Sequence, residues 1–383
     1  MSTVFSRQDH EKRLAVHVLM SASRPQISTP PSQPNKTMKR RSLLALATAL
    51  FSFPMAVEAA PTKLKIFIWP EYLPKSVIAK FEKEAGAKLV VDEYTSNEDM
   101  ISKVADGGSG YDIVCPSDYA VTTMIRQKLL AKLDASKLPN AKNIAERFQN
   151  PKYDEGGGHV VPYLVGTSGL GYSKSKAGDA PKKWADIYDP AKLAKWKGKV
   201  SIIDDPKEGP ASALMSLGLD VNSTSESDLE KALGLLKKQK PFLASYDSET
   251  FEDTLLKGET VVAQGYSGDL AAALKENKDL GYVIPEEGCV VAIDNFAILK
   301  DSKNVALAHK FIDFVCRPEI AAEIVNETGY IPANGKADDK IDADVKNSPT
   351  FALPAPDKSR SLKDLGQEGE DARAELWTKL KAE

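Results

Sequence analysis

The stretch KLKIFIWPEYLPKSVIAKFEKEAGAKLVVDEYTSNEDMISKVADGGSGYDIVC (63–115) alternates short apolar runs with amphipathic segments. Apolar runs of this length are typical of buried strands, and apolar residues three and four apart are typical of helices. The predicted elements are a strand at 63–69, a helix at 74–84 ended by Gly86, a strand at 88–92, a helix capped by Asn97, and a strand at 111–115. This alternation predicts an α/β fold with a doubly wound, mostly parallel sheet.

The same alternation returns further along the chain. It predicts strands at 200–203 and 260–264 and helices at 227–238 and 305–315. The second alternating stretch lies between two segments that belong with the first, so we expect two α/β lobes joined by chain crossings near 165–172 and 294–299. We expect the first lobe to comprise 60–165 plus 295–335, and the second 166–294 plus 336–383. Ligands bind beyond the carboxyl ends of such strands, which predicts a cleft between the lobes.

The segment from Met38 to Ala59 predicts export. Lys39, Arg40 and Arg41 precede a short apolar run, and Val57-Glu58-Ala59 offers small residues for cleavage, the pattern of a signal peptide over 38–59. A short buried helix is the alternative. Residues 1–37 are polar and aperiodic, which indicates a disordered segment or an over-extended start, and the sequence leaves open whether Met1 or Met38 is the true initiator.

Composition excludes some classes of function. The formal net charge of -3, which becomes about -8 after removal of residues 1–59, argues against a nucleic-acid partner. Cys115, Cys289 and Cys316 are an odd number without C-x-x-C spacing, and they are either one disulfide with a free thiol or simply buried residues.

Carboxylates and aromatic rings recur directly after the predicted strands. They are Trp69 and Tyr72, Tyr119 beside Ser117, Asp205 and Glu208, Tyr266 and Asp269, with Asp294 and Tyr330 further on. Carboxylates pair with ammonium groups, and aromatic faces attract cations and cover methylenes. Helix caps and core rings are the alternative for any one residue. As a set, these residues predict a site for a small organic cation.

Seven stretches resemble the bacterial spermidine/putrescine-binding proteins of polyamine ABC importers, over nearly the whole chain after residue 63. They are IWPEYLP (68–74), YDIVCPSDYAV (111–121), VPYLVGTSGLGY (161–172), WADIYDPAKLAKWKGKVSIIDDPKE (184–208), GYSGD (265–269), IPEEGCVVAID (284–294) and RPEIAAEIVNETGYIPAN (317–334). The resemblance implies the two-lobed type II periplasmic-binding-protein fold, a cationic amine as ligand, membrane permease subunits as partners and the periplasm of a Gram-negative bacterium.

The resemblance also implies roles for individual residues. Asp294 would anchor an amine nitrogen, and Asp205 and Glu208 would bind a terminal amine from the second lobe. The remaining ligand contacts would be Trp69, Tyr72, Ser117, Tyr119, Ser248, Tyr266, Asp269, Tyr330 and Gln367. Pro70, Tyr266 and Ala292 depart from the residues usual in this family, which leaves the identity of the amine open. The lobes would close over the ligand by hinge motion, and the protein would act as a monomer without cofactor or metal.

Other classes of protein lack support in the sequence. An enzyme would need a nucleophile with a base or a metal site, and His159 and His309 have no metal-ligand spacing. Iron binding would need paired tyrosines, and Tyr330 has no tyrosine next to it in sequence. Anion binding would need basic strand ends, which are acidic here. A binding protein for another cationic amine and a periplasmic amine sensor stay open.

Overall fold

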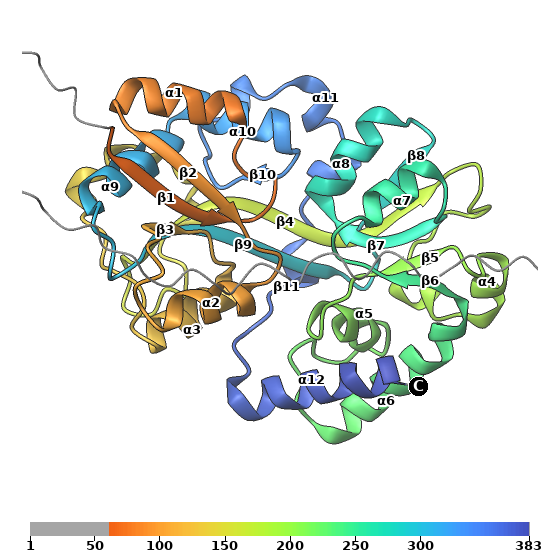
Figure 1. Cartoon of the computed structure of the whole chain (residues 1–383). Coiled ribbons are helices and arrows are strands. Elements are labelled where there is room, and N and C mark those ends of the chain that lie inside the picture. The colour runs from red at the N-terminus through yellow and green to blue at the C-terminus, as the bar shows by residue number, and fades with distance from the viewer. Residues whose placement is uncertain (1–60, 383) are drawn as a thin grey trace, which may run out of the picture. The chain divides into compact units, whose positions relative to one another are not determined.

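The alternating stretch near the start folds into parallel strands with helices on both faces (Figure 1). Its elements are β1 (Lys63–Ile68), α1 (Lys75–Ala85), β2 (Lys88–Glu93), α2 (Asn97–Ala105), β3 (Ile113–Val114) and α3 (Asp118–Arg126). β1 pairs in parallel with β2 and with β3. Ile66 and Ile68 pack with α1, and Phe67 packs with α2 and α3, because successive side chains of a strand point to opposite faces.

The computed structural model describes residues 61–382. The predicted signal peptide at 38–59 and the segment at 1–37 lie outside the described residues. None of the helices at 61–382 combines the length and the apolar character needed to cross a bilayer.

The remaining elements complete a mixed α/β architecture. They are β4 (Val160–Ser173), α4 (Pro190–Lys195), β5 (Val200–Ile202), α5 (Glu208–Ser216), α6 (Glu226–Gln239), β6 (Leu243–Tyr246), α7 (Phe251–Lys257), β7 (Val262–Tyr266), α8 (Ser267–Glu276), β8 (Leu280–Val283), β9 (Cys289–Ile298), α9 (Val305–Val315), α10 (Pro318–Thr328), β10 (Ile331–Pro332), α11 (Ala343–Lys346), β11 (Ser359–Arg360) and α12 (Gly366–Ala382). Short 3-10 turns lie at 135–137, 139–143, 146–148, 184–187, 240–242, 338–340, 349–351 and 356–358. The α/β prediction is confirmed.

The strands follow the order β2-β1-β3-β9-β4-β7-β5-β6, with β10 and β8 paired to β4 and β11 paired to β9. The strands joined by crossover helices pair in parallel, as β5 does with β6 and β7. β4 and β9 instead run antiparallel to each other, and β9 is also antiparallel to β3 and β4 to β7. Apart from the short parallel pairing of β11 with β9, the parallel ladders lie between strands of the βαβ units.

Two long strands carry the chain between two hydrophobic cores. The first core surrounds β1–β3 with α1, α9 and α10, and the second surrounds β5–β7 with α5 and α6. β4 contributes Val165 to the first core and Leu170 to the second, and β9 contributes Val290 to the second and Phe296 to the first. Figure 1 shows β4 and β9 running from one group of strands to the other.

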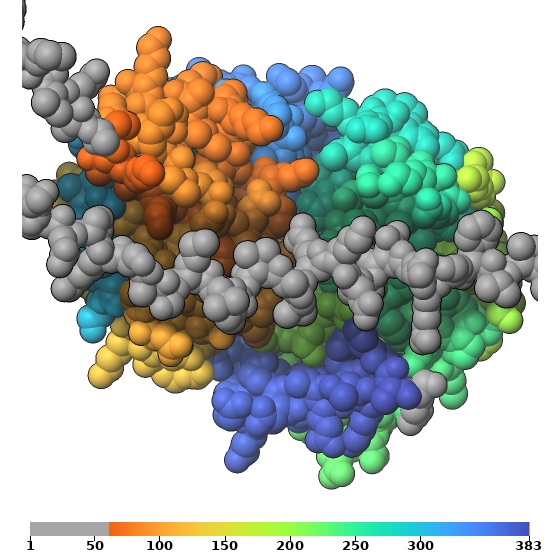
Figure 2. All heavy atoms as spheres, viewed as in Figure 1, coloured from red at the N-terminus to blue at the C-terminus, as the bar shows by residue number. Residues whose placement is uncertain are grey.

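The C-terminal segment contacts both parts of the described chain. Ala337 and Ile341 pack in the first core, whereas Trp377 and Leu380 pack in the second. Figure 2 shows the last part of this segment, in dark blue, below the orange N-terminal part of the described chain. The division of the chain into two lobes stays a prediction.

Local signals set several element ends that matter for the site. Gly86 ends α1 with a φ of 62° and donates its N–H to the carbonyl of Glu82, as predicted. The predicted cap of α2 was wrong by one residue, because the Ser96 hydroxyl accepts the N–H of Asp99 at 3.1 Å. Asn97 is therefore the first residue of the helix, and its side-chain amide is free for other partners.

The three cysteines are buried, and all carry free thiols. Of the two alternatives left open by the sequence, the structure has the buried residues rather than a disulfide. Burial raises the pKa of the Cys289 and Cys316 thiols to about 12, so both are protonated at neutral pH and pack as small apolar side chains.

Candidate ligand-binding site

Asp294, on β9, is a buried carboxylate held by neutral donors. The Ser117 hydroxyl donates to its Oδ1 at 2.6 Å, and the Tyr72 hydroxyl donates to its Oδ2 at 2.9 Å. Burial raises the pKa of Asp294 to about 6, although the hydrogen bonds from Ser117 and Tyr72 and the nearby indole N–H of Trp69 each lower it. The acid is thus oriented by hydrogen bonds, but no cation is among the groups that set its pKa.

Trp69, at the end of β1, offers an unused donor beside this carboxylate. Its indole nitrogen is buried and has no hydrogen-bond partner among residues 61–382. The ring packs on Tyr94 at a centroid distance of 4.6 Å. Buried donors without a partner are uncommon in proteins, so this nitrogen is suited to a ligand or to Asp294 after a small movement.

Asn97 links Ser117 to Tyr119, a role that the sequence did not predict. Its amide nitrogen donates to the Ser117 hydroxyl and to the Tyr119 hydroxyl, both at 3.1 Å. Its carbonyl oxygen accepts the backbone N–H of Ser117 at 3.1 Å. The only signal in the sequence was its place after a strand end, and that signal was taken for a helix cap.

Asp205 and Glu208 lie together at the start of α5. One oxygen of Asp205 accepts the backbone N–H groups of Lys207 and Glu208, at 2.7 and 2.8 Å. Ser168, on β4, donates to Oε1 of Glu208 at 3.0 Å. Burial and the nearby charge of Asp205 raise the pKa of Glu208 to about 8, and burial also raises the pKa of Asp205. Asp205 thus accepts backbone N–H groups at the start of α5, as the capping alternative predicted, and its place in a ligand cleft stays a prediction.

Asp118 is a further buried acid that the predicted site omitted. It is the first residue of α3, and one of its oxygens accepts the N–H of Tyr119 at 2.9 Å. Burial raises its pKa to about 8, and the charge of Asp294 contributes to the rise. The sequence PSDY at 116–119 contained the signal, since this acid directly follows a strand end.

Tyr330 and Asp269 pair across the fold. The Tyr330 hydroxyl donates to Oδ1 of Asp269 at 3.0 Å, and burial and the charge of Glu252 raise the pKa of Asp269 to about 7. The Tyr330 ring also packs on Tyr72, with centroids 4.9 Å apart. Tyr330 has no tyrosine next to it in sequence, but the fold brings Tyr72 to it from far away in the chain. No group of three His, Cys, Asp or Glu side chains within residues 61–382 could hold a metal ion.

Carboxylates from several parts of the chain act on the pKa of Tyr266. Burial raises the pKa of its hydroxyl well above the ordinary value, and the charges of four carboxylates add to the rise. These carboxylates belong to Glu208, Asp205, Asp269 and Asp294. Tyr266 therefore marks the point at which the predicted acids come together.

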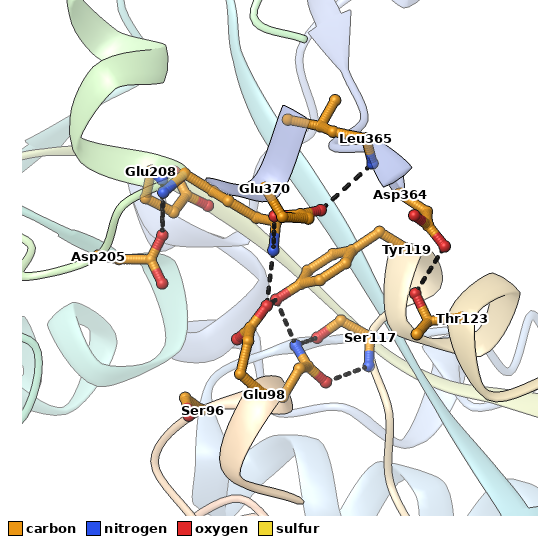
Figure 3. A network of polar contacts seen from close by, with 12 residues as sticks. Ser96, Glu98, Ser117, Tyr119, Thr123, Asp205, Glu208, Asp364, Leu365 and Glu370 are labelled. Atoms are coloured by element: carbon orange, nitrogen blue, oxygen red, sulfur yellow. Dashed lines mark hydrogen bonds and ion pairs between the residues drawn. The ribbon is translucent and has the colours of Figure 1, made fainter. Parts of the chain in front are cut away.

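One basic side chain enters the cluster. The Lys207 ammonium pairs with Oε1 of Glu98 at 2.6 Å and with Oε2 of Glu370 at 2.8 Å. It also lies 4.5 Å from the centre of the Tyr119 ring. Figure 3 shows Glu98 and Glu370 approaching the same point beside Tyr119. Lys207 stands between two predicted site residues, Asp205 and Glu208, but was not itself predicted.

Two predicted residues take no part in these contacts. Gln367 is exposed, and its amide nitrogen donates to Asp371 of its own helix at 2.8 Å. Ser248 follows β6, and its buried hydroxyl has no hydrogen-bond partner among residues 61–382. The structure thus brings together ten of the twelve predicted residues, and Glu370, one turn along α12 from Gln367, reaches the cluster instead.

Both histidines of the described chain have structural partners. Nδ1 of His159 lies 2.7 Å from Oδ1 of Asp154. Nε2 of His309 accepts the backbone N–H of Asp134 at 2.9 Å, and the ring lies buried in α9. Neither histidine contacts a serine or cysteine in these bonds, so neither forms the nucleophile–base pair that covalent catalysis requires.

Comparison with known proteins places this geometry among transport proteins. Residues 76–353 match the sequence profile described as bacterial extracellular solute-binding protein. The chain is similar to the putrescine/cadaverine-binding protein of Pseudomonas aeruginosa, with 35% identity over 355 residues that cover 89% of this chain and 99% of the relative. It is also similar to a putrescine-binding periplasmic protein of Escherichia coli, with 32% identity over 356 residues that cover 88% and 96%.

A solved structure is similar in fold as well as in sequence. It is the spermidine/putrescine ABC transporter substrate-binding protein of Streptococcus pneumoniae, with a TM-score of 0.74 and 27% identity. The match covers 84% of this chain and 99% of that protein.

Proposed function

The chain belongs to the bacterial extracellular solute-binding protein family, and from that premise we propose that it captures a polyamine for an ABC importer. The family consists of transport proteins and is not a class of enzymes. The curated relatives are named for the binding of putrescine, cadaverine or spermidine, and two of the most similar are matched over nearly their whole length. A polyamine is a short apolar chain with an ammonium group at each end, which fits a cluster of acids and rings.

The observation that carries the proposal is the state of Asp294. This carboxylate is 4% exposed and is oriented by Ser117 and Tyr72, which are both neutral. A buried charge without a counter-charge is unfavourable, and an ammonium group that joins it removes that cost. The pKa of Asp294, which burial raises to about 6, reflects the same cost of holding a charge without a counter-charge. Asp294 is therefore proposed as the anchor of one ligand nitrogen.

The surroundings of Asp294 suit the rest of such a ligand. Tyr72 and Tyr330 present a pair of packed rings, and Tyr266 lies within the field of the other acids. Rings of this kind cover methylene groups and attract cations, by about 0.5–2 kcal/mol each according to how dry the site is. Asp269 and Glu208, whose pKa values burial raises to about 7 and about 8, are the proposed partners of a second nitrogen.

Closure of two lobes over the ligand is the proposed mechanism. The first lobe would contribute Trp69, Tyr119 and Asp294, and the second would bring Asp205, Glu208 and Tyr266. β4 and β9 support this mechanism, because each contributes residues to both cores. A bend in these two strands would move one core relative to the other as a rigid body. The hydrogen bond from Tyr330 to Asp269 is one contact that such a motion would make and break.

The proposal extends to location and partners. The segment at 38–59 is proposed to direct the chain to the periplasm, in agreement with the curated relatives named as periplasmic proteins. The protein is proposed to act as a monomer that delivers its ligand to the permease subunits of the importer, without a cofactor.

Isothermal titration calorimetry tests the proposal directly. The purified protein, unfolded and refolded to remove any ligand carried from the cell, is titrated with putrescine, cadaverine, spermidine, spermine and agmatine. We expect saturable one-to-one binding of at least one amine, with lysine and arginine as amino-acid controls that bind more weakly because they carry a carboxylate. Absence of binding to all five amines would overturn the proposal.

A further inference from the structure

Lys207 makes the contacts that a ligand ammonium would need. Its nitrogen has two carboxylate partners, Glu98 and Glu370, and an aromatic face, that of Tyr119. Two carboxylates and one ring are also what a binding protein offers to an organic cation. The lysine side chain is only 6% exposed, so its charge is held inside the cluster and not at the surface.

The partners of Lys207 come from separate parts of the chain. Glu98 lies on α2, Tyr119 on α3 and Glu370 on α12, whereas Lys207 precedes α5. Figure 3 shows Tyr119, Glu98 and Glu370 meeting at one point, with Asp205 and Glu208 alongside. Burial alone would lower the pKa of Lys207, but the charges and hydrogen bonds of Glu98 and Glu370 raise it, so the side chain is a cation at neutral pH.

A chain of hydrogen bonds joins the surroundings of Lys207 to the proposed anchor Asp294. The Tyr119 hydroxyl accepts a hydrogen bond from Asn97, which also donates to Ser117, and Ser117 donates to Asp294. The side chains of Tyr119, Asn97, Ser117 and Asp294 are therefore joined by hydrogen bonds without a gap, and we call this row of four residues the floor. A ligand extended along this floor from Asp294 would reach the space that the lysine ammonium fills.

The two ends of this floor differ in charge balance. At the Tyr119 end, Glu98 and Glu370 are paired with the protein's own cation. At the other end, none of the groups that shift the pKa of Asp294 or Asp269 is a cation. Positive charge is therefore already supplied at one end and is lacking at the other.

We propose that Lys207 determines specificity by occupying one ammonium position of the cleft, so that the protein favours a short diamine over a longer triamine. The proposal rests on the function proposed above. A third ammonium placed at the Tyr119 end would meet the Lys207 charge and would have to displace it from two carboxylates. A diamine that spans only the Asp294 and Asp269 region meets no such repulsion.

The test measures how the preference for chain length changes when the lysine charge is removed. Calorimetry gives the Kd of putrescine, cadaverine and spermidine for the wild-type protein and for Lys207→Met, which keeps an apolar stem of similar length. We expect the wild type to bind the better diamine about tenfold or more tightly than spermidine, and Lys207→Met to shift that ratio about tenfold or more toward spermidine. Lys195→Met is the matched control, since Lys195 is exposed on α4 and its loss changes the net charge equally.

A second variant controls for the possibility that Lys207→Met alone disturbs folding. Lys207→Met leaves Glu98 and Glu370 facing each other without a cation, so the double variant Lys207→Met/Glu370→Gln removes one of the two acids as well. Glu98 then remains as the partner of the additional ligand ammonium, and the same shift toward spermidine is expected.

The outcomes separate this inference from the proposed function. A wild type that binds no amine overturns both. A wild type that prefers spermidine to both diamines overturns the inference alone. So does a variant in which the Kd values of diamines and spermidine change by the same factor, because Lys207 would then only help to hold the structure closed.

Discussion

The hydroxyl of Tyr330 donates a hydrogen bond of 3.0 Å to Asp269, a residue 61 positions earlier in the chain. The bond joins the segment after α10, which packs in the first core, to the first turn of α8. The bond sets the position of an acid whose pKa burial raises to about 7. Four predictions follow from this cluster.

Removal of the Tyr330 hydroxyl should weaken ligand binding moderately. Tyr330→Phe keeps the ring on Tyr72 but leaves Asp269 without its donor, and a hydrogen bond of this kind contributes about 1 kcal/mol, or several-fold in Kd. Tyr111→Phe is the control, because it removes a 2.9 Å bond to a carboxylate, that of Asp92, outside the cluster. Calorimetry with the best amine measures both, and an equal loss in the control would contradict the prediction.

Neutralisation of Asp294 should cost far more. Asp294→Asn keeps the shape, and its amide oxygen can accept from one of the two hydroxyls while its amide nitrogen donates to the other. It removes the charge that pairs with the ligand ammonium inside a closed site. We expect a loss of about 2–5 kcal/mol, which is a rise in Kd of roughly thirtyfold or more. Asp106→Asn, an exposed acid of the same region, should leave the Kd unchanged. An unaltered Kd in Asp294→Asn would place the anchor elsewhere.

Amine affinity should rise with pH. Burial raises the pKa values of Asp294, Asp269, Asp118 and Glu208 to about 6, 7, 8 and 8, so part of this set is protonated and neutral at pH 6. An ammonium ligand stabilises the ionised form of each acid and stays charged itself throughout this range. The Kd should therefore fall between pH 5.5 and pH 8.5, with the steepest change from pH 6 to pH 8.

Proton release is the second measurement of the same effect. Binding at pH 7 should expel protons from these acids, which titrations in two buffers of different ionisation heat detect as a difference in apparent enthalpy. Asp118→Asn should reduce the number of protons released. Affinity that is flat or that falls over this pH range would show that the acids are ionised before the ligand arrives.

Gly268→Ala should disturb the contact between Tyr330 and α8. A Cβ atom at residue 268 would lie 1.9 Å from Cε2 of Tyr330, so the ring must move away from Asp269. We expect amine affinity to fall about tenfold or more while the circular dichroism spectrum is retained. Gly234→Ala in α6 is the control, because its Cβ meets nothing within 4 Å and alanine favours the helix by about 1 kcal/mol. Wild-type affinity in Gly268→Ala would refute the close packing.

Most of the site was predictable because of where its residues stand along the chain. Trp69, Ser117, Asp205 and Tyr266 all lie at or just beyond the carboxyl end of a strand, and the carboxyl ends of parallel strands meet at one edge of a sheet. Asp118 could have been included by the same rule. The contacts of Gln367 could not be predicted in this way, because no local sequence pattern indicates where its helix, α12, packs.

The sequence by itself determined the βαβ alternation, the α/β fold and the gathering of acids and rings at the strand ends. These follow from short-range periodicity, which each segment expresses independently of the others. Only the tertiary structure decided which of these groups meet, as Tyr72 meets Asp294 across 222 residues and Lys207 meets Glu98 across 109. Such pairings depend on how two cores pack around β4 and β9, and no local property of Lys207 in the sequence indicates that it pairs with Glu98 and Glu370.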